Sequence, residues 1–251
     1  MKLVTPDISW QETGHPFSED YEDIYFSAED PIGESEHVFL RGNLLPERWQ
    51  QLDKDQFTLA ELGFGSGLNF LLACKLWNES PTRGQRLHYI AFEKHPLQLD
   101  QMQKLHALWP ELQPFSEQFI AQYADQGSGC HRFLLSDAVI LDLHFGNAKD
   151  RLSQLEQRAG IDAWFLDGFN PKRNHALWES NILRQVARLS HSDTTLSTYS
   201  VAGSLRRNLN QIGFTIKKIR GFGRKRHMLQ ASYEQTDIQN QPLSEPWNKV
   251  P

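Results

Sequence analysis

The stretch Phe57–Asn69 reads F-T-L-A-E-L-G-F-G-S-G-L-N. It predicts a buried strand, a glycine turn and the start of a helix, in that order. Glycines let the backbone of such a turn approach a nucleotide more closely than side chains would permit. The turn has the pattern G-x-G-x-G, with Glu61 two residues before its first glycine, whereas the pyrophosphate fingerprint is G-x-G-x-x-G. The stretch therefore favours S-adenosylmethionine, a methionine joined to an adenosyl group, over NAD.

Outward from this stretch, apolar runs alternate with segments of helical spacing. Such alternation predicts an α/β fold with a mostly parallel, doubly wound sheet and helices on both faces. The predicted strands are Phe57–Leu62, Arg86–Phe92, Cys130–Leu135, Ala138–Phe145, Asp162–Leu166, Thr195–Tyr199, Phe214–Ile219 and Met228–Glu234. The predicted helices are Leu68–Glu79, Leu97–Leu108, Ser116–Tyr123, Ala148–Ala159, His175–Leu189 and Val201–Ile212.

The N-terminal region has a different character, since it is rich in aromatic and acidic residues. In residues 1–50 we predict a small antiparallel addition, with strands near Ile24–Phe26 and Val38–Leu40. Its aromatic side chains either cover an edge of the main sheet or, in the case of Tyr25 or Phe26, cap a substrate pocket. The main domain is then expected over residues 51–236.

Composition limits the classes of protein that fit. With 39% hydrophobic and 23% charged residues the chain is typical of a folded globular protein. No apolar run approaches the roughly 20 residues needed to cross a bilayer, and the N-terminus lacks a signal-peptide pattern. We therefore expect a cytoplasmic protein without a membrane partner. Residues 237–251 are polar and contain proline, which is typical of a linker-like tail.

Several chemistries lack support in the sequence. Cys74 and Cys130 do not have metal-ligand spacing, and the ten histidines form no H-E-x-x-H set. No G-x-S-x-G elbow or phosphate-binding loop of the G-x-x-x-x-G-K-[ST] type is present. We therefore expect no metal, and neither a hydrolase nor a kinase.

Polar residues follow four of the predicted strands. In an open parallel sheet, ligands bind beyond the carboxyl ends of strands, near the point where the strand order reverses. Glu93 lies about as far beyond the glycines as a carboxylate that accepts both ribose hydroxyls, and Asn147 could bond the adenine edge through its amide. As plain alternatives, Glu93 could be a solvated carboxylate and Asn147 part of a turn. Together with Glu61 and Asp167 these residues predict a single site at one sheet edge.

Asp167 follows a buried-type strand and precedes the turn Gly168-Phe169. A carboxylate there could position an amine, accept its proton or bond a hydroxyl, or it could simply cap the turn. The chemistry that connects these features is methyl transfer, in which the protein aligns a nucleophile and keeps it neutral. Alkyl amines are mostly protonated at neutral pH, like lysine with its pKa of about 10.4, so a proton acceptor is needed.

Cations gather near the C-terminal end of the predicted domain. They are Lys217, Lys218, Arg220, Arg224, Lys225 and Arg226, with Arg206 and Arg207 upstream. The net charge of -5 gives no overall reason to expect nucleic acid, but a local cluster can bind phosphates through counterion release. A solvated face is the alternative.

Longer motifs carry a resemblance to a known family. The segments E-L-G-F-G-S-G-L-N-F-L, F-E-K, D-A-W-F-L-D-G-F-N-P and G-F-G-R-K-R begin at Glu61, Phe92, Asp162 and Gly221. They resemble the methyltransferase module of the MnmC family, bifunctional enzymes that modify the wobble uridine of tRNA. The N-terminal D-Y-E-D-I-Y-F-S and the L-W-P-E-L at Leu108 are similar too, so the resemblance covers nearly the whole chain.

The resemblance implies a class I, Rossmann-like methyltransferase that uses S-adenosylmethionine. Its substrate would be 5-aminomethyl-2-thiouridine at the tRNA wobble position, and its product 5-methylaminomethyl-2-thiouridine. The expected catalytic residues are Asp167 and Phe169. The expected cofactor site comprises Glu61, Gly63, Gly65, Gly67, Asn69, Glu93, Lys94, Asn147 and Asp167. The expected substrate and tRNA contacts are Tyr25, Phe26, Gly168, Arg220, Arg224, Lys225 and Arg226.

Two departures and two alternatives accompany this interpretation. Asn147 stands where the family often has Asp, and Asn170 where alanine is common. The fused enzymes also contain an FAD-dependent oxidase module, and no flavin-type glycine fingerprint follows Gly67 here. We therefore expect a stand-alone methyltransferase or an excised first module, and the linker-like end favours the second. The alternatives are a methyltransferase for a small-molecule amine and a non-catalytic tRNA-binding module.

Overall fold

The structure, a computed structural model, describes residues 3–11, 15–27, 29–82, 84–124, 127–156, 160–170 and 173–234. The predicted tail at residues 237–251 lies outside them. The division at residues 50 and 236 stays a prediction.

A mostly parallel sheet forms the centre of the molecule, as predicted. Its strands in the described residues are β4 Gln56–Leu62, β5 Arg86–Glu93, β6 Gly129–Ser136, β7 Val139–Phe145, β8 Ile161–Leu166, β9 Ser190–Thr198, β10 Phe214–Arg220 and β11 His227–Tyr233. Their order is β10-β11-β9-β8-β4-β5-β7-β6. The pairs from β9 to β7 are parallel, whereas β6, β10 and β11 pair antiparallel. The fold is Rossmann-like.

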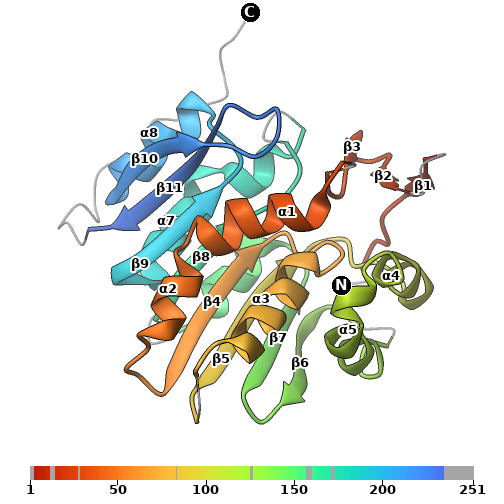
Figure 1. The fold of residues 1–251 in the computed structure, drawn as a ribbon. Coiled ribbons are helices and arrows are strands. Elements are labelled where there is room, and N and C mark those ends of the chain that lie inside the picture. Colours follow the sequence, from red (N-terminus) through yellow and green to blue (C-terminus); the bar gives the residue numbers. More distant parts are fainter. Residues whose placement is uncertain are drawn as a thin grey trace, which may run out of the picture.

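Alternation along β4 explains why helices cover both faces of the sheet. Phe57 and Leu59 belong to one apolar cluster, whereas Ala60 and Leu62 belong to another. Because successive side chains of a strand point to opposite faces, these clusters are two core layers. Helices α2 Leu45–Gln50, α3 Leu68–Glu79, α4 Leu99–His106 and α5 Gln113–Ile120 pack in the first layer. Helices α6 Ala148–Gln154, α7 Ser180–Leu189 and α8 Gly203–Gln211 pack in the second (Figure 1).

The N-terminal addition contains the predicted antiparallel sheet, followed by helices that were not predicted. Strands β1 Ile8–Trp10, β2 Pro16–Ser18 and β3 Asp23–Ile24 form the small sheet. The 5-residue helix α1 Pro31–Ser35 and the π-helix η1 Glu36–Arg41 follow. The predicted strand Val38–Leu40 is therefore wrong: all three side chains are buried, and a short apolar run does not distinguish a strand from a buried helix.

Smaller differences concern where helices end. The predicted helix His175–Leu189 is split into a 3-10 turn, η4 His175–Trp178, and α7, because Glu179 adopts extended dihedral angles. Helix α6 ends at Gln154, before the predicted Ala159. A further 3-10 turn, η2 Pro110–Leu112, precedes α5. Within the described residues, no helix is long and apolar enough to cross a membrane.

Candidate functional site

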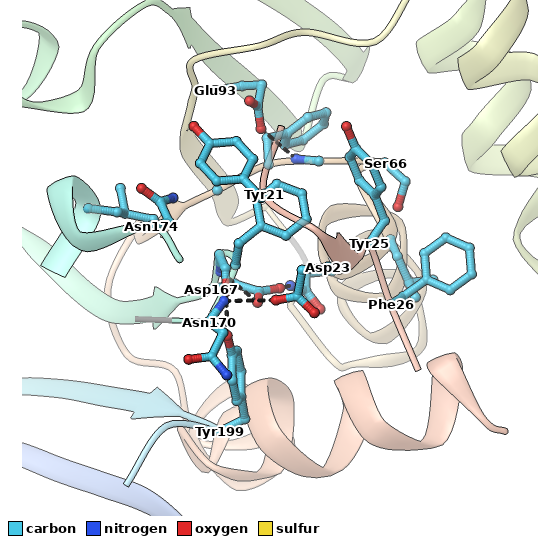
Figure 2. A pocket seen from close by; sticks show the side chains of 18 of the residues that line it. Tyr21, Asp23, Tyr25, Phe26, Ser66, Glu93, Asp167, Asn170, Asn174 and Tyr199 are labelled. Carbon is cyan, nitrogen blue, oxygen red and sulfur yellow. Dashed lines mark hydrogen bonds between the residues drawn. The ribbon is translucent and has the colours of Figure 1, made fainter. Parts of the chain in front are cut away.

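A cavity of about 440 Å³ opens at the carboxyl ends of β4, β5 and β8. Strand β4 lies between β5 and β8, so the chain order reverses at this point. Parallel sheets bind ligands at such a switch point. The glycine turn, the end of β5, the segment after β8 and the N-terminal addition all contribute lining residues (Figure 2).

The glycine turn has the backbone shape that a close ligand requires. Gly63 has φ +91°, and a Cβ there would lie 2.5 Å from the carbonyl oxygen of Asp167. Gly65 has φ +53° and lines the cavity, where a Cβ would meet only the Tyr25 ring, at 3.6 Å. Gly67 has φ +75° at the start of α3 and does not line the cavity. A side chain at Gly65 would therefore occupy the space beside the turn.

The Glu93 carboxylate is fixed at the end of β5. Its Oε2 accepts the backbone N–H of Gly65 at 2.8 Å, and its Oε1 accepts that of His95 at 2.7 Å. Each carboxylate oxygen can accept a further hydrogen bond, and the residue lines the cavity. The two carboxylate oxygens could therefore accept hydrogen bonds from two hydroxyls on adjacent carbons of a ligand. The exposed side chain of Lys94 also lines the cavity.

Asn147 caps α6 at the edge of the same cavity. Its Oδ1 accepts the backbone N–H of Lys149 at 3.0 Å. This bond engages the oxygen, so the amide nitrogen is the donor that the side chain can offer a ligand. The turn interpretation of Gly146-Asn147 and a ligand contact are therefore compatible.

Glu61 does not face the cavity. Its side chain is completely buried, and its pKa is raised well above the usual range, first by burial and second by Asp167. Asn69 Nδ2 donates to Glu61 Oε1 at 2.7 Å and to Asp167 Oδ2 at 2.8 Å. Tyr89 donates its hydroxyl to Glu61 Oε2 at 2.8 Å. Glu61 therefore reaches the cavity through Asn69, which does line it.

Asp167 directly follows β8 and lines the cavity. Its Oδ1 accepts the backbone N–H of Gly168 at 2.8 Å. Burial raises the pKa of Asp167 to about 7, against the hydrogen bonds from Gly168 and Asn69. A carboxyl with this pKa exchanges a proton near neutral pH, which suits a general base.

Aromatic rings form a wall beside Asp167. Phe169 stacks on Tyr21, with ring centroids 4.6 Å apart and an interplanar angle of 21°. Tyr25 meets Phe169 edge-on at 5.2 Å. Phe26 lines the cavity and contacts Trp109 at 5.2 Å. The wall thus contains the predicted residues Tyr25, Phe26 and Phe169. It also contains Tyr21, which was not among the predicted site residues.

The N-terminal addition is bonded to the segment that follows β8. Asp23 Oδ2 accepts the backbone N–H of Asn170 at 2.9 Å, and Glu22 forms an ion pair with Arg173 (Figure 2 shows the Asp23 contact). These contacts place the Tyr21 ring over Phe169. Tyr199 donates its hydroxyl to the carbonyl of Gly168 from the opposite side.

The predicted cations separate into two groups. Lys225 lines the cavity and forms an ion pair with Glu34 of α1. Arg220, Arg224 and Arg226 are exposed, as Lys225 is, but they do not line the cavity. Arg224 forms a 3.4 Å ion pair with Glu29, in which both side chains are largely exposed. Among the described residues, no group of three or more potential metal ligands occurs.

Comparison with known proteins relates these features to a family. A family model described as S-adenosyl-L-methionine-dependent methyltransferase matches residues 110–234. The chain is 41% identical to the tRNA 5-methylaminomethyl-2-thiouridine biosynthesis bifunctional protein MnmC of Vibrio campbellii, over 98% of this chain and 37% of that protein. The MnmC of Azoarcus sp. is 43% identical over 93% of this chain and 36% of that protein. The chain thus spans a little more than a third of the length of these relatives.

A solved structure agrees with the fold. The crystal structure of MNMC2 from Aquifex aeolicus superposes with a TM-score of 0.71 at 22% identity, covering 93% of this chain and 71% of that chain. The glycine turn lets a ligand approach the backbone, and the Glu93 carboxylate offers acceptor oxygens, so the switch point fits an adenosyl ligand. The chain therefore belongs to the S-adenosylmethionine-dependent methyltransferases and is similar to one part of the MnmC proteins.

Proposed function

We propose that the chain methylates the amine of 5-aminomethyl-2-thiouridine at the wobble position of tRNA, giving 5-methylaminomethyl-2-thiouridine. The observation that carries this proposal is the Asp167 carboxyl, which lies in the cofactor cavity beside an aromatic wall and has a pKa near 7. The nucleoside is suggested by the names of the MnmC relatives.

The cofactor would lie between the glycine turn and Glu93. The backbone at Gly65 would lie against the ligand, and the Glu93 carboxylate would accept the ribose hydroxyls. Asn147 would offer its amide to the adenine edge, and Lys94 would lie at the rim. When bound, S-adenosylmethionine supplies a methyl group that is already activated by a positively charged sulfur.

The amine must lose a proton before it can act as a nucleophile. An alkyl ammonium has a pKa of about 10.4 in water, so the cavity has to favour the neutral amine. The ionised Asp167 accepts one proton from the ammonium, which exposes the nitrogen lone pair. The methyl group supplied by S-adenosylmethionine would then be bonded to this nitrogen as its carbon–sulfur bond breaks, and the product would be a protonated secondary amine. The positive charge passes from sulfur to nitrogen.

The aromatic wall would hold the base of the acceptor nucleotide. Flat faces of Tyr and Phe rings stack with any base and are used in this way by proteins that bind single-stranded RNA. Tyr21 and Tyr25 converge on Phe169, the residue two positions after Asp167. A base stacked here would present its substituent to the carboxylate.

The exposed cations would contact the body of the tRNA. Arg220, Arg224 and Arg226 lie on β10 and the turn to β11, close in the chain to Lys225 at the cavity. Their positive charges would bind phosphates by releasing counterions. The MnmC relatives are named as bifunctional, so we further propose an FAD-dependent oxidase module, fused or separate, as a partner in the cytoplasm.

Salt dependence separates tRNA from a small amine as the substrate. If tRNA phosphates are bound, kcat/KM for tRNA should fall steeply between about 50 and 200 mM salt, with a slope near -0.9 per phosphate contact on a log–log plot. A small amine would show a nearly flat plot. Replacing Arg226 with methionine should reduce the tRNA slope by about one unit. A flat plot for tRNA would favour the small-amine alternative, and no calorimetric affinity for S-adenosylmethionine would favour a non-catalytic module.

A further inference from the structure

Besides Asp167, the carboxylate of Glu34 lines the part of the cavity in which the substrate amine would lie. Glu34 lies in α1, whose first turn is capped by Asp30, which accepts the backbone N–H of Gly33 at 2.8 Å. Its side chain is only 14% exposed and lines the cavity. Its Oε1 accepts a hydrogen bond from Lys225 Nζ at 2.5 Å, which joins two residues 191 positions apart in the chain. The sequence alone gives no reason to select it.

A line of contacts leads from this ion pair to the reacting carboxylate. Lys225 Nζ lies 4.9 Å from the centroid of the Tyr199 ring, over its face. The Tyr199 hydroxyl donates to the carbonyl of Gly168, and the N–H of Gly168 donates to Asp167. Lys225 is therefore held by a carboxylate on one side and by an aromatic ring on the other.

We propose that Glu34 is a positioning residue of the acceptor site, which holds Lys225 against Tyr199 and so leaves the Asp167 carboxylate for the ammonium group of the substrate. This inference rests on the proposed function.

The charges around Asp167 give the reason. Lys225 and Asp167 line the same cavity, and the Lys225 side chain is 52% exposed. Without Glu34, the lysine would be free to turn toward the partly buried Asp167 carboxylate, whose opposite charge attracts it. Its ammonium would then occupy the place that the substrate ammonium needs. Glu34 prevents this by neutralising Lys225 at a fixed point.

The Asp167 carboxyl also has titratable neighbours other than Glu34 and Lys225. Burial raises the pKa of Asp167 first, the Glu34 charge raises it further, and the Lys225 charge lowers it. Glu61 and Tyr89 lie behind Asn69, and Tyr199 and Asp23 approach from other elements. Neither replacement changes the side chains of Glu61, Tyr89 or Asp23. Tyr199 is affected by both, because Lys225 packs on its ring and the Glu34 charge raises its pKa.

A second ion pair between the N-terminal addition and the turn after β10, formed by Glu29 and Arg224, provides a matched control. The side chains of Arg224 and Glu29 are 91% and 70% exposed. Neither lines the cavity. An exposed pair of this kind has little influence on a distant carboxyl.

The test measures the titration of Asp167 by NMR in protein whose aspartate carboxyl groups carry ¹³C, with Asp167→Asn identifying the signal. In Glu34→Gln the Asp167 midpoint should fall by about one pH unit, because the Glu34 charge that raises it is lost and Lys225 is released toward Asp167. Removing Lys225 as well, in Glu34→Gln/Lys225→Met, should raise the midpoint again. Lys225→Met should change the Asp167 midpoint more in the Glu34→Gln background than in the wild type, because without Glu34 the lysine can approach Asp167 more closely. Glu29→Gln should leave the midpoint unchanged.

The same variants predict a pattern in the kinetics. Glu34→Gln should lower kcat/KM for tRNA about tenfold, and Lys225→Met in that background should restore most of it. An unchanged midpoint in Glu34→Gln, or equal effects of Lys225→Met in both backgrounds, would overturn the inference. The inference would also be overturned if Lys225→Met reduced the salt slope of kcat/KM for tRNA by about one unit, since Lys225 would then be a phosphate contact. Wild-type protein that fails to methylate tRNA would contradict the proposed function, whereas the titration is read without turnover.

Discussion

Replacing Asp167 with asparagine is expected to slow methyl transfer by about 10²- to 10⁴-fold, the range typical of lost general-base catalysis. Asparagine keeps the shape of the side chain but cannot accept a proton from an ammonium group. Affinity for S-adenosylmethionine should change little, because we propose that Glu93 and the glycine turn bind the adenosyl end, whereas Asp167 accepts the proton. Single-turnover rates with labelled cofactor measure the first effect, and calorimetry measures the second.

The surrounding hydrogen bonds allow this variant to fold. An amide nitrogen at position 167 would face Asn69 Nδ2, which is also a donor. Asn69 Oδ1, however, is buried and has no hydrogen-bond partner among the described residues, so a rotation of the Asn69 amide offers an acceptor instead. After that rotation the same oxygen faces Glu61, whose raised pKa favours the protonated form that can donate to it.

The pH dependence of the wild type provides a second readout. Burial raises the pKa of Asp167 to about 7, so the proton-accepting form is lost as the pH falls through that value. The rate should therefore decline about tenfold per pH unit well below pH 7, and this limb should be absent in Asp167→Asn. Asp137→Asn, in an exposed turn between β6 and β7, is the matched control. A near-normal rate in Asp167→Asn would show that Asp167 is not the proton acceptor.

Replacing Glu93 with alanine is expected to weaken S-adenosylmethionine binding about 10- to 100-fold, since a hydrogen bond to a charged group contributes about 1.5–3 kcal/mol. The carboxylate would contact the ribose and also fixes the amides of Gly65 and His95. Glu93→Gln should have an intermediate effect, because its amide offers one acceptor oxygen in place of two. Calorimetric titration measures both variants.

The control for this prediction is Glu111→Ala, which removes an exposed carboxylate on η2 and does not line the cavity. Its affinity should equal that of the wild type. If Glu93→Ala also binds the cofactor as tightly as the wild type, Glu93 has no role at the ribose.

Local patterns were sufficient for the centre of the fold. Helix Leu68–Glu79 was predicted with the observed bounds, because Gly67 fixes its start and its apolar spacing is strong. The strand that ends at Glu93 was predicted to within one residue. These elements bring the glycine turn and Glu93 together through parallel pairing of β4 with β5. Such pairing follows from alternation of strands and helices, which a sequence displays.

Glu61 illustrates a signal that was present but not used. It lies on the same face of β4 as Phe57 and Leu59, and these side chains face the layer that contains α3. Alternation therefore directs Glu61 to Tyr89 and Asn69 in the interior. A period of two along the strand predicts this direction.

Other site residues were not predictable, because distant segments create their positions. Tyr21 reaches Phe169 only when Asp23 bonds the backbone of Asn170, 147 positions away. Glu34 and Tyr199 likewise acquire their roles from contacts across the cavity. Loop conformation and long-range packing decide these contacts, and no local periodicity records them.

The most direct test of the proposed function supplies the protein with labelled S-adenosylmethionine and two tRNAs, one carrying the aminomethyl group at the wobble uridine and one lacking it. Nucleoside mass spectrometry then locates the label. We expect 5-methylaminomethyl-2-thiouridine in the first tRNA and no label in the second. Equal labelling of both tRNAs, or label at another nucleoside of the first, would contradict methylation of the wobble amine.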